Sequence, residues 1–323
     1  MQSNEQLLAL IENHLAQIEF AAEPELLYAP IGYSLAGGGK RLRPMLTLLG
    51  CSLFTDEVQR ALPAASAVEV FHNFTLLHDD IMDNAAVRRG KPSVYAKWGQ
   101  NVAILSGDAM LICAYRLLGE VPPQLLPHIL RTFNTMALEV CEGQQYDMDF
   151  EQRQKVSVVE YMHMIELKTS ALLAGATVIG ALLGGASEED CRKLRRFAVE
   201  LGLAFQLQDD LLDSYGDQRL GKAIGGDILE GKKTYLMITA MSRAEESARD
   251  VLRNAYRDPM LTDAEKIAAV KAIYDRYDIP RLTEQQISLR FERALGILET
   301  LSVDPARLEP MREYARGLMG RNK

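Results

Sequence analysis

The chain has 323 residues, of which 48% are apolar and 25% are charged, and these proportions are ordinary for a globular protein. This length suits one large domain or two medium ones. The net charge of −8 at pH 7 argues against a general binder of nucleic acids or of anionic membranes, but it leaves room for a local basic patch that holds a small anion.

Two features indicate the compartment in which the protein works. The first twenty residues, MQSNEQLLALIENHLAQIEF, predict an acidic amphipathic helix and lack the pattern of a signal peptide. The four cysteines are scattered, without zinc spacing, and a chain of this size does not need disulfides. They predict free core thiols in a reducing cytoplasm, and the four are Cys51, Cys113, Cys141 and Cys191.

Helical patterns follow one another along nearly the whole chain. No proline occurs between Pro127 and Pro259, which suits long helices with short connections. Capping boxes at Ser157–Glu160 and Thr262–Glu265 each open an apolar stretch with helical period. Alternating strand patterns are absent, and no low-complexity linker divides the chain. Residues 1–323 therefore predict a single all-α domain.

The longest apolar run, Ala171–Ala186, predicts a buried core helix. It is shorter than the ~20 residues that a membrane span needs, and Lys168 and Glu188 flank it closely. Its small residues would let a neighbouring helix or a ligand chain approach closely. No membrane span is predicted.

Acidic residues crowd the stretch LLHDDIMDNAAVRRG, residues 76–90. Asp79 and Asp83 share a helix face, where like charges destabilise a helix by roughly 0.2–0.5 kcal/mol per pair. Asp80 lies between them, and Arg88 and Arg89 follow at once. The stretch is either a solvated helix end or a divalent metal site, with an anionic ligand between acids and arginines.

A second copy of the same spacing favours the metal site. Residues 206–213 read QLQDDLLD and contain Asp209, Asp210 and Asp213, 130 residues after the first motif. Each motif ends an apolar helical run. Carboxylate oxygens suit Mg²⁺, which also binds phosphate oxygens, so two such clusters facing each other across a bundle would hold several Mg²⁺ ions and a diphosphate. The absence of Cys residues or of a His pair at ligand spacing argues against zinc.

Basic motifs accompany the acidic ones. Residues 37–44, GGGKRLRP, are either a phosphate-binding loop or a surface turn, and they do not form a P-loop. The stretch MIELKTSALLAG places Lys168 and Thr169 before a small-residue helix, where the lysine could face a cavity or snorkel to solvent. The stretch GKAIGGDILEGKKT adds Lys222, Asp227, Lys232 and Lys233, which again suit phosphate oxygens.

Two histidines lie on the helix of the first acidic motif. A lone histidine on an apolar face is more often a core group than a catalyst. His72 is interpreted either as a ligand contact or as a core group, and His78 as structural.

In this order, the motifs GGGKRLRP, HNFTLLHDDIMD with RRG, ELKTSALL, FQLQDDLLD and GKAIGGDILEGKKT resemble those of the trans-isoprenyl diphosphate synthases, the polyprenyl synthetases. They span residues 37–235. The resemblance implies an antiparallel helical bundle of the isoprenoid synthase type around a central cavity, usually as a homodimer. It also implies a prenyltransferase that joins isopentenyl diphosphate to an allylic diphosphate.

The resemblance also implies roles for individual residues. Three Mg²⁺ ions are expected, held mainly by Asp79, Asp83 and Asp209, with Asp80, Asp210 and Asp213 in support. The expected cationic contacts of the allylic diphosphate are Arg88, Lys168, Lys222 and Lys232. The expected isopentenyl diphosphate pocket comprises Gly39, Lys40, Arg43, His72 and Arg89. Thr169 and Gln206 match groups beside the reacting carbons.

The length of the product is expected to depend on what blocks the cavity behind the first motif. Phe74 and Phe71 start roughly 7.5 and 12 Å deeper along the helix than Asp79, and Thr75 is small. An aromatic residue at position 74 resembles the short-chain enzymes of the family. We therefore expect a C15–C20 product, farnesyl or geranylgeranyl diphosphate, over a C30–C40 product. The alternative is that both rings are core packing.

Three other functions are weighed. A class I terpene cyclase would carry an Asn/Ser/Glu metal motif in place of the second DDxxD and would not need Lys40 and Arg43. A non-catalytic synthase subunit would lack the acidic motifs. A helical scaffold with acidic patches would leave the ordered basic motifs unexplained.

Overall fold

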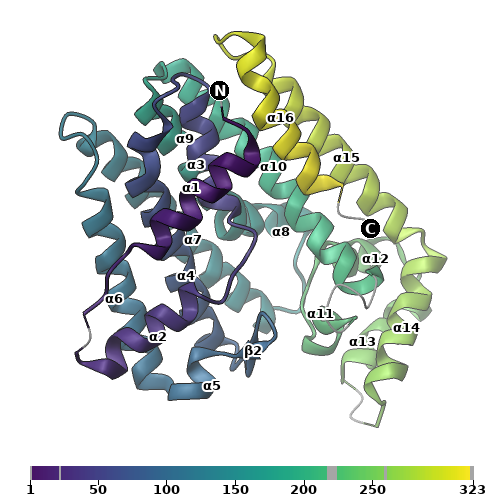
Figure 1. The fold of residues 1–323 in the computed structure, drawn as a ribbon. Coiled ribbons are helices and arrows are strands. Elements are labelled where there is room, and N and C mark those ends of the chain that lie inside the picture. Colours follow the sequence, from purple (N-terminus) through teal and green to yellow (C-terminus); the bar gives the residue numbers. More distant parts are fainter. Residues whose placement is uncertain (1, 22, 217–223, 258–259, 321–323) are drawn as a thin grey trace. The chain divides into compact units, whose positions relative to one another are not determined.

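The computed structural model describes residues 2–21, 23–216, 224–257 and 260–320, and nearly every element within them is a helix (Figure 1). The predicted all-α class is therefore confirmed. In chain order the elements are α1 (Asn4–Ala16), α2 (Glu25–Leu35), α3 (Leu42–Ser52), the 3₁₀ turn η1 (Val58–Ala61), α4 (Leu62–Met82), β1 (Val87–Arg88), β2 (Lys91–Pro92), α5 (Val94–Trp98), α6 (Gln100–Leu118), α7 (Leu126–Gln152), α8 (Val158–Ile165), the π-helical turn η2 (Glu166–Ser170), α9 (Ala171–Gly184), α10 (Glu188–Tyr215), α11 (Gly226–Glu230), α12 (Tyr235–Arg243), α13 (Glu246–Arg257), α14 (Asp263–Arg276), α15 (Ile279–Leu298) and α16 (Pro305–Met319).

Helix starts follow the local sequence. Both predicted capping boxes are present, Ser157–Glu160 at α8 and Thr262–Glu265 at α14, and a third, Ser3–Gln6, opens α1. In each box two side chains exchange hydrogen bonds with two backbone N–H groups. These N–H groups would otherwise lack partners inside the first helical turn.

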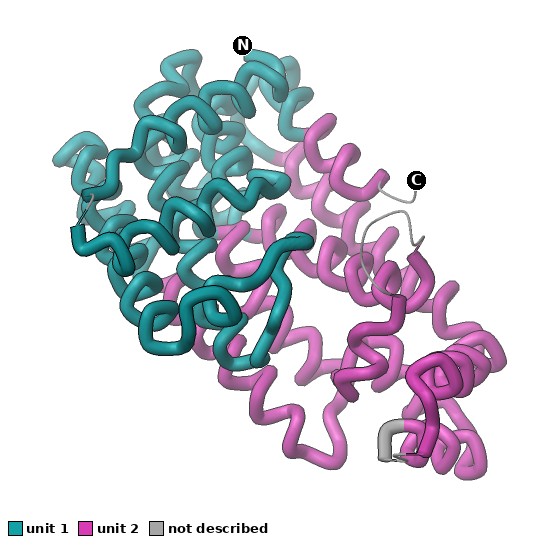
Figure 2. Tube along the Cα trace, turned by 60° about the horizontal axis from the view of Figure 1, so that its bottom comes forward, with its two compact units in different colours: residues 1–134, 175–195, 301–311 teal, residues 135–174, 196–300, 312–323 magenta. Residues whose placement is uncertain are grey.

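Contacts along the chain divide it into two compact units, shown in different colours in Figure 2. Unit 1 comprises residues 1–134, 175–195 and 301–311. Unit 2 comprises residues 135–174, 196–300 and 312–323. A single domain remains the prediction from the sequence.

In unit 1, α4 packs against α1, α2, α3 and α6. The close approach predicted for the small residues of 171–186 occurs between α3 and α9. A Cβ atom on Gly180 would lie 1.9 Å from the carbonyl oxygen of Thr47, and one on Gly50 would lie 2.4 Å from that of Thr177. Only glycine fits at these two positions without moving the backbone of the facing helix.

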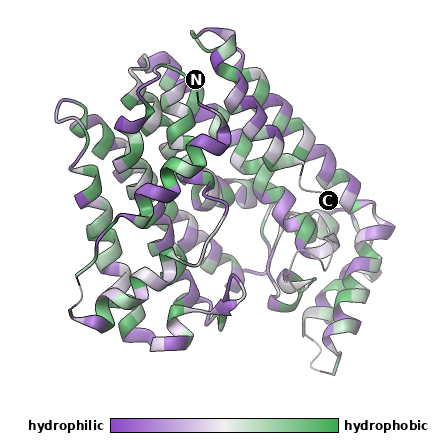
Figure 3. Ribbon diagram, viewed as in Figure 1, coloured by the Kyte–Doolittle hydropathy of each residue, from purple (hydrophilic) through white to green (hydrophobic). Residues whose placement is uncertain are grey.

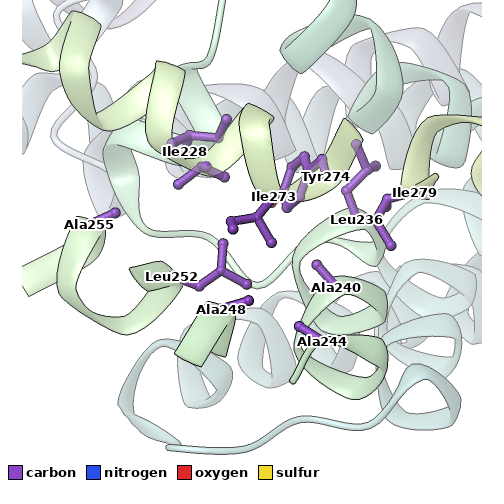
Figure 4. Packing of buried hydrophobic residues seen from close by; sticks show 11 residues of the cluster. Ile228, Leu236, Ala240, Ala244, Ala248, Leu252, Ala255, Ile273, Tyr274 and Ile279 are labelled. Carbon is purple, nitrogen blue, oxygen red and sulfur yellow. The ribbon is translucent and has the colours of Figure 1, made fainter. Parts of the chain in front are cut away.

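In unit 2, a hydrophobic cluster holds α11 to α15 together. Ile228 of α11, Leu236 of α12, Leu252 of α13 and Tyr274 of α14 point toward one another (Figure 4). All four side chains are at most 2% exposed. Through Ile228 the cluster includes α11, the helix that follows the second acidic motif in the chain.

Two described stretches are long and apolar enough to cross a membrane, Gln100–Leu118 and Val158–Gly184. The second is 72% buried, which is typical of a core helix in a soluble protein and agrees with the predicted core position of residues 171–186. The first is only 39% buried, and hydrophobic residues follow the length of α6 (Figure 3).

The four cysteines are free, as predicted. Cys51 and Cys191 are buried, and Cys113 is partly exposed. Cys141 is exposed and therefore differs from the predicted core position.

Candidate active site

The three acids of the first motif lie at the end of α4 in different surroundings. Asp80 is only 3% exposed, and its carboxylate accepts a hydrogen bond of 2.8 Å from Nε of Arg88. A second guanidinium nitrogen of Arg88 lies 3.4 Å from Asp79, whose side chain is one-fifth exposed. Asp83 is exposed. Burial raises the pKa of Asp80, and the hydrogen bond and charge of Arg88 oppose that rise.

A two-residue turn presents the neighbouring arginines. Strands β1 and β2 pair antiparallel, with Arg88 opposite Lys91. Arg89 and Gly90 form the turn with φ values of 53° and 74°, which suit a tight hairpin. Arg88, Arg89 and Asp80 line a cavity in unit 1.

The predicted isopentenyl diphosphate residues of unit 1 gather around His72. Nη1 of Arg43 lies 3.0 Å from Nε2 of His72. Burial, together with the charges of Arg43 and Arg89, lowers the pKa of His72 well below its usual value, so the ring is neutral and can accept from Arg43. Arg89 donates to the carbonyl oxygen of Gly38, and its guanidinium lies so close to Gly39 that a Cβ there would be 3.0 Å away.

The cations of GGGKRLRP do not all face the same surroundings. Lys40 is exposed and Arg43 is partly exposed. Arg41 is buried at 6% exposure, and it is paired with Glu69 at 2.8 Å. The sequence pattern alone did not distinguish Arg41 from its neighbours.

The acids of the second motif lie in the last turns of α10. Asp209 and Asp213 are partly exposed, whereas Asp210 is 4% exposed. The Asp210 carboxylate accepts hydrogen bonds from Nε2 of Gln206 at 3.0 Å and from the hydroxyl of Tyr161. The backbone N–H of Tyr235 lies 3.5 Å from the same carboxylate. Burial raises the pKa of Asp210 to about 6, against the effect of these donors.

A π-helical turn carries the two residues of the predicted Lys–Thr motif. Lys168 pairs with Asp147 of α7 at 2.5 Å, and the hydroxyl of Thr169 donates to Oε1 of Gln206 at 2.9 Å. Single π turns inside helices are frequent at functional sites. Thr169, Gln206 and Asp210 thus form one hydrogen-bonded chain in unit 2.

Two glycines press on this turn from either side. A Cβ on Gly143 of α7 would lie 2.2 Å from the backbone nitrogen of Lys168. A Cβ on Gly202 of α10 would lie 2.6 Å from the hydroxyl oxygen of Ser170. These contacts fix the backbone from which Lys168 and Thr169 project.

The basic residues after the second motif are placed only in part. Lys222 lies outside the described residues. Nζ of Lys232 lies 2.7 Å from Glu230 and 3.9 Å from Asp227. Lys233 donates to the carbonyl oxygens of Phe150 and Glu151 at 2.6 and 3.2 Å.

The donor set fits Mg²⁺ that is shared with substrate. Among the described residues, no group of three or more His, Cys, Asp or Glu side chains could hold a metal by itself. The acids that face solvent in each motif are hard oxygen donors, and Mg²⁺ commonly takes one or two carboxylates together with waters and phosphate oxygens. In unit 2, burial and the charges of Asp213 and Asp210 raise the pKa of Asp227 to about 7, a repulsion that a cation would relieve.

Aromatic rings pack against one another, at tilted and edge-on angles, behind the first motif. The ring of Phe74 lies 5.5 Å from that of Phe71, which lies 5.1 Å from Phe133 of α7. Phe71 is 1% exposed, whereas Phe74 is only partly buried. The hydroxyl of Thr75 donates to the carbonyl oxygen of His72 and so turns back on its own helix.

With this geometry in place, comparison with known proteins identifies the family. The polyprenyl synthetase family model matches residues 24–276. The chain belongs to the polyprenyl synthetase family. It is a prenyltransferase that makes short-chain prenyl diphosphates.

The chain is similar to a geranylgeranyl diphosphate synthase of Methanosarcina mazei, with 45% identity over 68% of this chain and 69% of the relative. It is 40% identical to a short chain isoprenyl diphosphate synthase of Methanocaldococcus jannaschii over 79% of this chain and 78% of the relative. A crystal structure of a geranylgeranyl pyrophosphate synthase matches the fold with a TM-score of 0.94 and 41% identity over the whole of both chains. These matches confirm the isoprenoid synthase fold type.

Several residues of this polyprenyl synthetase were not found from the sequence. Glu69 holds Arg41, Asp147 holds Lys168, and Tyr161 holds Asp210. Glu69 carried a usable signal, because a lone carboxylate inside the apolar run AVEVF indicates a buried partner. Asp147 stands among polar residues and Tyr161 in the largely apolar stretch VVEYMHMI, and neither position carried such a signal.

Proposed function

We propose that this protein condenses isopentenyl diphosphate head to tail with an allylic diphosphate, releases diphosphate, and makes a trans-prenyl diphosphate of C15–C20. The observation that carries the proposal is the gathering of Arg43, His72 and Arg89 in unit 1, near the acidic end of α4 and Arg88. Such a grouping of arginines suits an oxyanion, and the adjacent carboxylates suit the Mg²⁺ that accompanies diphosphates.

Three Mg²⁺ ions would be held mainly by Asp79, Asp83 and Asp209. When bound, Mg²⁺ stabilises the negative charge of the departing diphosphate. Because their carboxylates are buried and hydrogen-bonded to protein groups, we assign supporting roles to Asp80 and Asp210. Asp213 is the third supporting acid.

The chain's own cations divide between the two substrates. Arg88, Lys168, Lys222 and Lys232 would hold the allylic diphosphate. Gly39, Lys40, Arg43, His72 and Arg89 would hold isopentenyl diphosphate. Fixing both substrates turns a bimolecular attack into an effectively unimolecular one, which can supply a large part of the rate.

The reaction needs no protein nucleophile. Loss of diphosphate leaves an allylic cation, and the hydroxyl of Thr169 and the amide of Gln206 would present dipoles beside the reacting carbons. The double bond of isopentenyl diphosphate attacks this cation, and the proton then lost from the new chain passes to the released diphosphate. Exclusion of water protects the cation until the new bond forms.

Phe74, with Phe71 behind it, would stop the growing chain. Of these two rings Phe74 is closer to the acids in sequence, and Phe71 is fixed between two other rings. The names of the relatives, which include a geranylgeranyl diphosphate synthase, also support a short product. A C30–C40 product would require both rings to lie outside the path of the chain.

We also propose that the protein works as a homodimer in the cytoplasm. On α6, Ile104, Leu105, Ile112 and Tyr115 form a stripe at helical spacing, and they are 37–61% exposed. Such a stripe is a natural isologous contact for a second copy of the chain. Light scattering of the purified protein tests this, and a monomer at micromolar concentration would exclude it.

The test of the reaction is a product assay. Purified protein receives Mg²⁺, labelled isopentenyl diphosphate and, in separate reactions, dimethylallyl, geranyl or farnesyl diphosphate, and dephosphorylated products are sized by chromatography. We expect a Mg²⁺-dependent product of C15 or C20. A series of products that reaches C30 or beyond would refute the proposed product length. Absence of elongation from every starter would favour a terpene cyclase or a non-catalytic synthase subunit instead.

A further inference from the structure

We propose that Arg41, Glu69 and Glu12 are positioning residues that hold the GGGKRLRP loop in the conformation that binds isopentenyl diphosphate. This inference rests on the proposed function, because it takes Lys40 and Arg43 of that loop as substrate contacts. Arg41 lies between these two cations in sequence, yet it is buried where Lys40 is exposed. Its charge is therefore directed into the protein.

The guanidinium of Arg41 is held on three sides. Nη1 donates to Glu69 of α4 at 2.8 Å, and Nε donates to Glu12 of α1 at 2.8 Å. Nη2 donates to the carbonyl oxygen of Leu35, at the end of α2, at 3.2 Å. Three helices thus meet at one side chain, so the position of the loop is tied to all of them.

Glu69 is itself fixed in place. It is 2% exposed, and Nδ2 of Asn73 lies 3.3 Å from the same carboxylate oxygen that accepts from Arg41. His72, the neighbour of Asn73, contacts Arg43 at 3.0 Å. One face of α4 therefore contacts both arginines of GGGKRLRP, Arg41 through Glu69 and Arg43 through His72.

The backbone conformation of Arg41 explains why its side chain must be held in place. Its φ of 46° is in the left-handed region, which residues other than glycine rarely adopt. Gly38 and Gly39, with φ values of 72° and 139°, precede it, and α3 begins at the next residue. The buried ion pair holds Arg41, the non-glycine residue of this bend that has a positive φ, in a conformation that it would otherwise leave.

Two roles of Glu69 predict opposite effects, which makes the proposal testable. If Glu69 acted only through its charge, neutralising it would make the pocket more positive, and isopentenyl diphosphate would bind more tightly. If it positions the loop, neutralising it loosens Arg41 and weakens binding. The charge and positioning roles therefore differ in sign.

The experiment measures KM for each substrate separately, with the other saturating, in Glu69→Gln and Arg41→Lys. We expect KM for isopentenyl diphosphate to rise roughly tenfold, as for a contact displaced by less than 1 Å, while KM for dimethylallyl diphosphate changes little. An unchanged or lowered KM for isopentenyl diphosphate would overturn the proposal. So would a parallel rise in both KM values, which indicates general loosening.

Glu12→Gln covers the case in which the buried variants fail to fold, because the side chain of Glu12 is 47% exposed. It is expected to raise KM for isopentenyl diphosphate about two- to threefold, as suits a partly exposed partner, and no rise would overturn the role of α1. Glu5→Gln, an exposed carboxylate on the same helix, is the matched control and should change neither KM.

A further pair of variants separates this proposal from the proposed function. Lys40→Ala and Arg43→Ala should each raise KM for isopentenyl diphosphate more than Glu69→Gln does. If they leave it unchanged, the assignment of the loop fails. If they raise it and Glu69→Gln does not, only the positioning role fails.

Discussion

The two Asp-rich motifs share one spacing, yet the second acid of each is held differently. In α4, Asp80 is buried against the guanidinium of Arg88, so that one charge meets another. In α10, Asp210 is buried among neutral donors, including the amide of Gln206 and the hydroxyl of Tyr161.

This difference shows what the D-D-x-x-D spacing determines. On a helix, the first and third acids share a face and the second is turned about 100° from the first, so the spacing selects which acid is buried. The spacing does not select the partner. Arg88 offsets the buried charge of Asp80 with an opposite charge, whereas Asp210 has dipoles as its hydrogen-bond partners, and burial raises the pKa of Asp210 to about 6 despite them.

The largest effect is expected from substitution of the first acid of either motif. Asp79→Ala or Asp209→Ala should lower turnover by at least about a hundredfold, because each removes a proposed Mg²⁺ ligand. Steady-state rates across a Mg²⁺ titration check this, with circular dichroism to verify that the helices are intact. Unchanged turnover in either variant would exclude that acid as a ligand.

A stability comparison separates the two second acids. Asp80→Asn leaves the Arg88 guanidinium without its full charge partner and should lower the free energy of unfolding by about 1–3 kcal/mol. Asp210→Asn keeps an acceptor for Tyr161 and removes a buried charge, so its loss should be less than about 1 kcal/mol. Urea denaturation measures both, and a larger loss in Asp210→Asn would contradict the comparison.

A smaller effect is expected from the hydroxyl that holds Asp210. Tyr161→Phe should cost about 1 kcal/mol of stability and lower kcat, because Gln206 and Thr169 share the same hydrogen-bonded chain. Tyr146→Phe is the matched control, since Tyr146 is an exposed tyrosine in the same unit. Equal effects of the two variants on kcat would show that Tyr161 has no specific role in the active site.

The least disruptive change concerns the residue five positions before the first acid. This residue is Phe74 in the first motif and Ala204 in the second. Phe74→Ala should lengthen the product while turnover stays within about threefold, since no diphosphate contact is lost. Chromatography of dephosphorylated products checks this, and an unchanged product would mean that Phe74 does not stop the chain.

Local sequence rules predicted much of this fold. The capping boxes at Ser157–Glu160 and Thr262–Glu265 begin helices as expected, and most of the run 171–186 forms the buried helix α9, which ends at Gly184. These features depend on a few neighbouring residues, so periodicity and capping reveal them. The division into two units depends on contacts between residues that are distant in sequence. No linker-like stretch in the sequence indicated it.

The candidate site, like the fold, could be predicted only where it depends on neighbouring residues in the sequence. Residue types and spacing identified Asp80, but not that it is buried, and they did not distinguish the buried Arg41 from the neighbouring cations of GGGKRLRP. That outcome depends on partners distant in sequence, such as Glu69, which is 28 residues from Arg41. The π turn at Glu166–Ser170 had no sequence signal either, because it arises from packing against helices that come from elsewhere in the chain.

The two glycines around that turn limit how the enzyme can be varied. At Gly143 even one methyl group would meet backbone, and at Gly202 it would meet both the side chain and the backbone of Ser170. A mutant library that randomises these positions would therefore yield mostly inactive members. Engineering of product length should keep both glycines unchanged and should vary the aromatic residues of α4 instead.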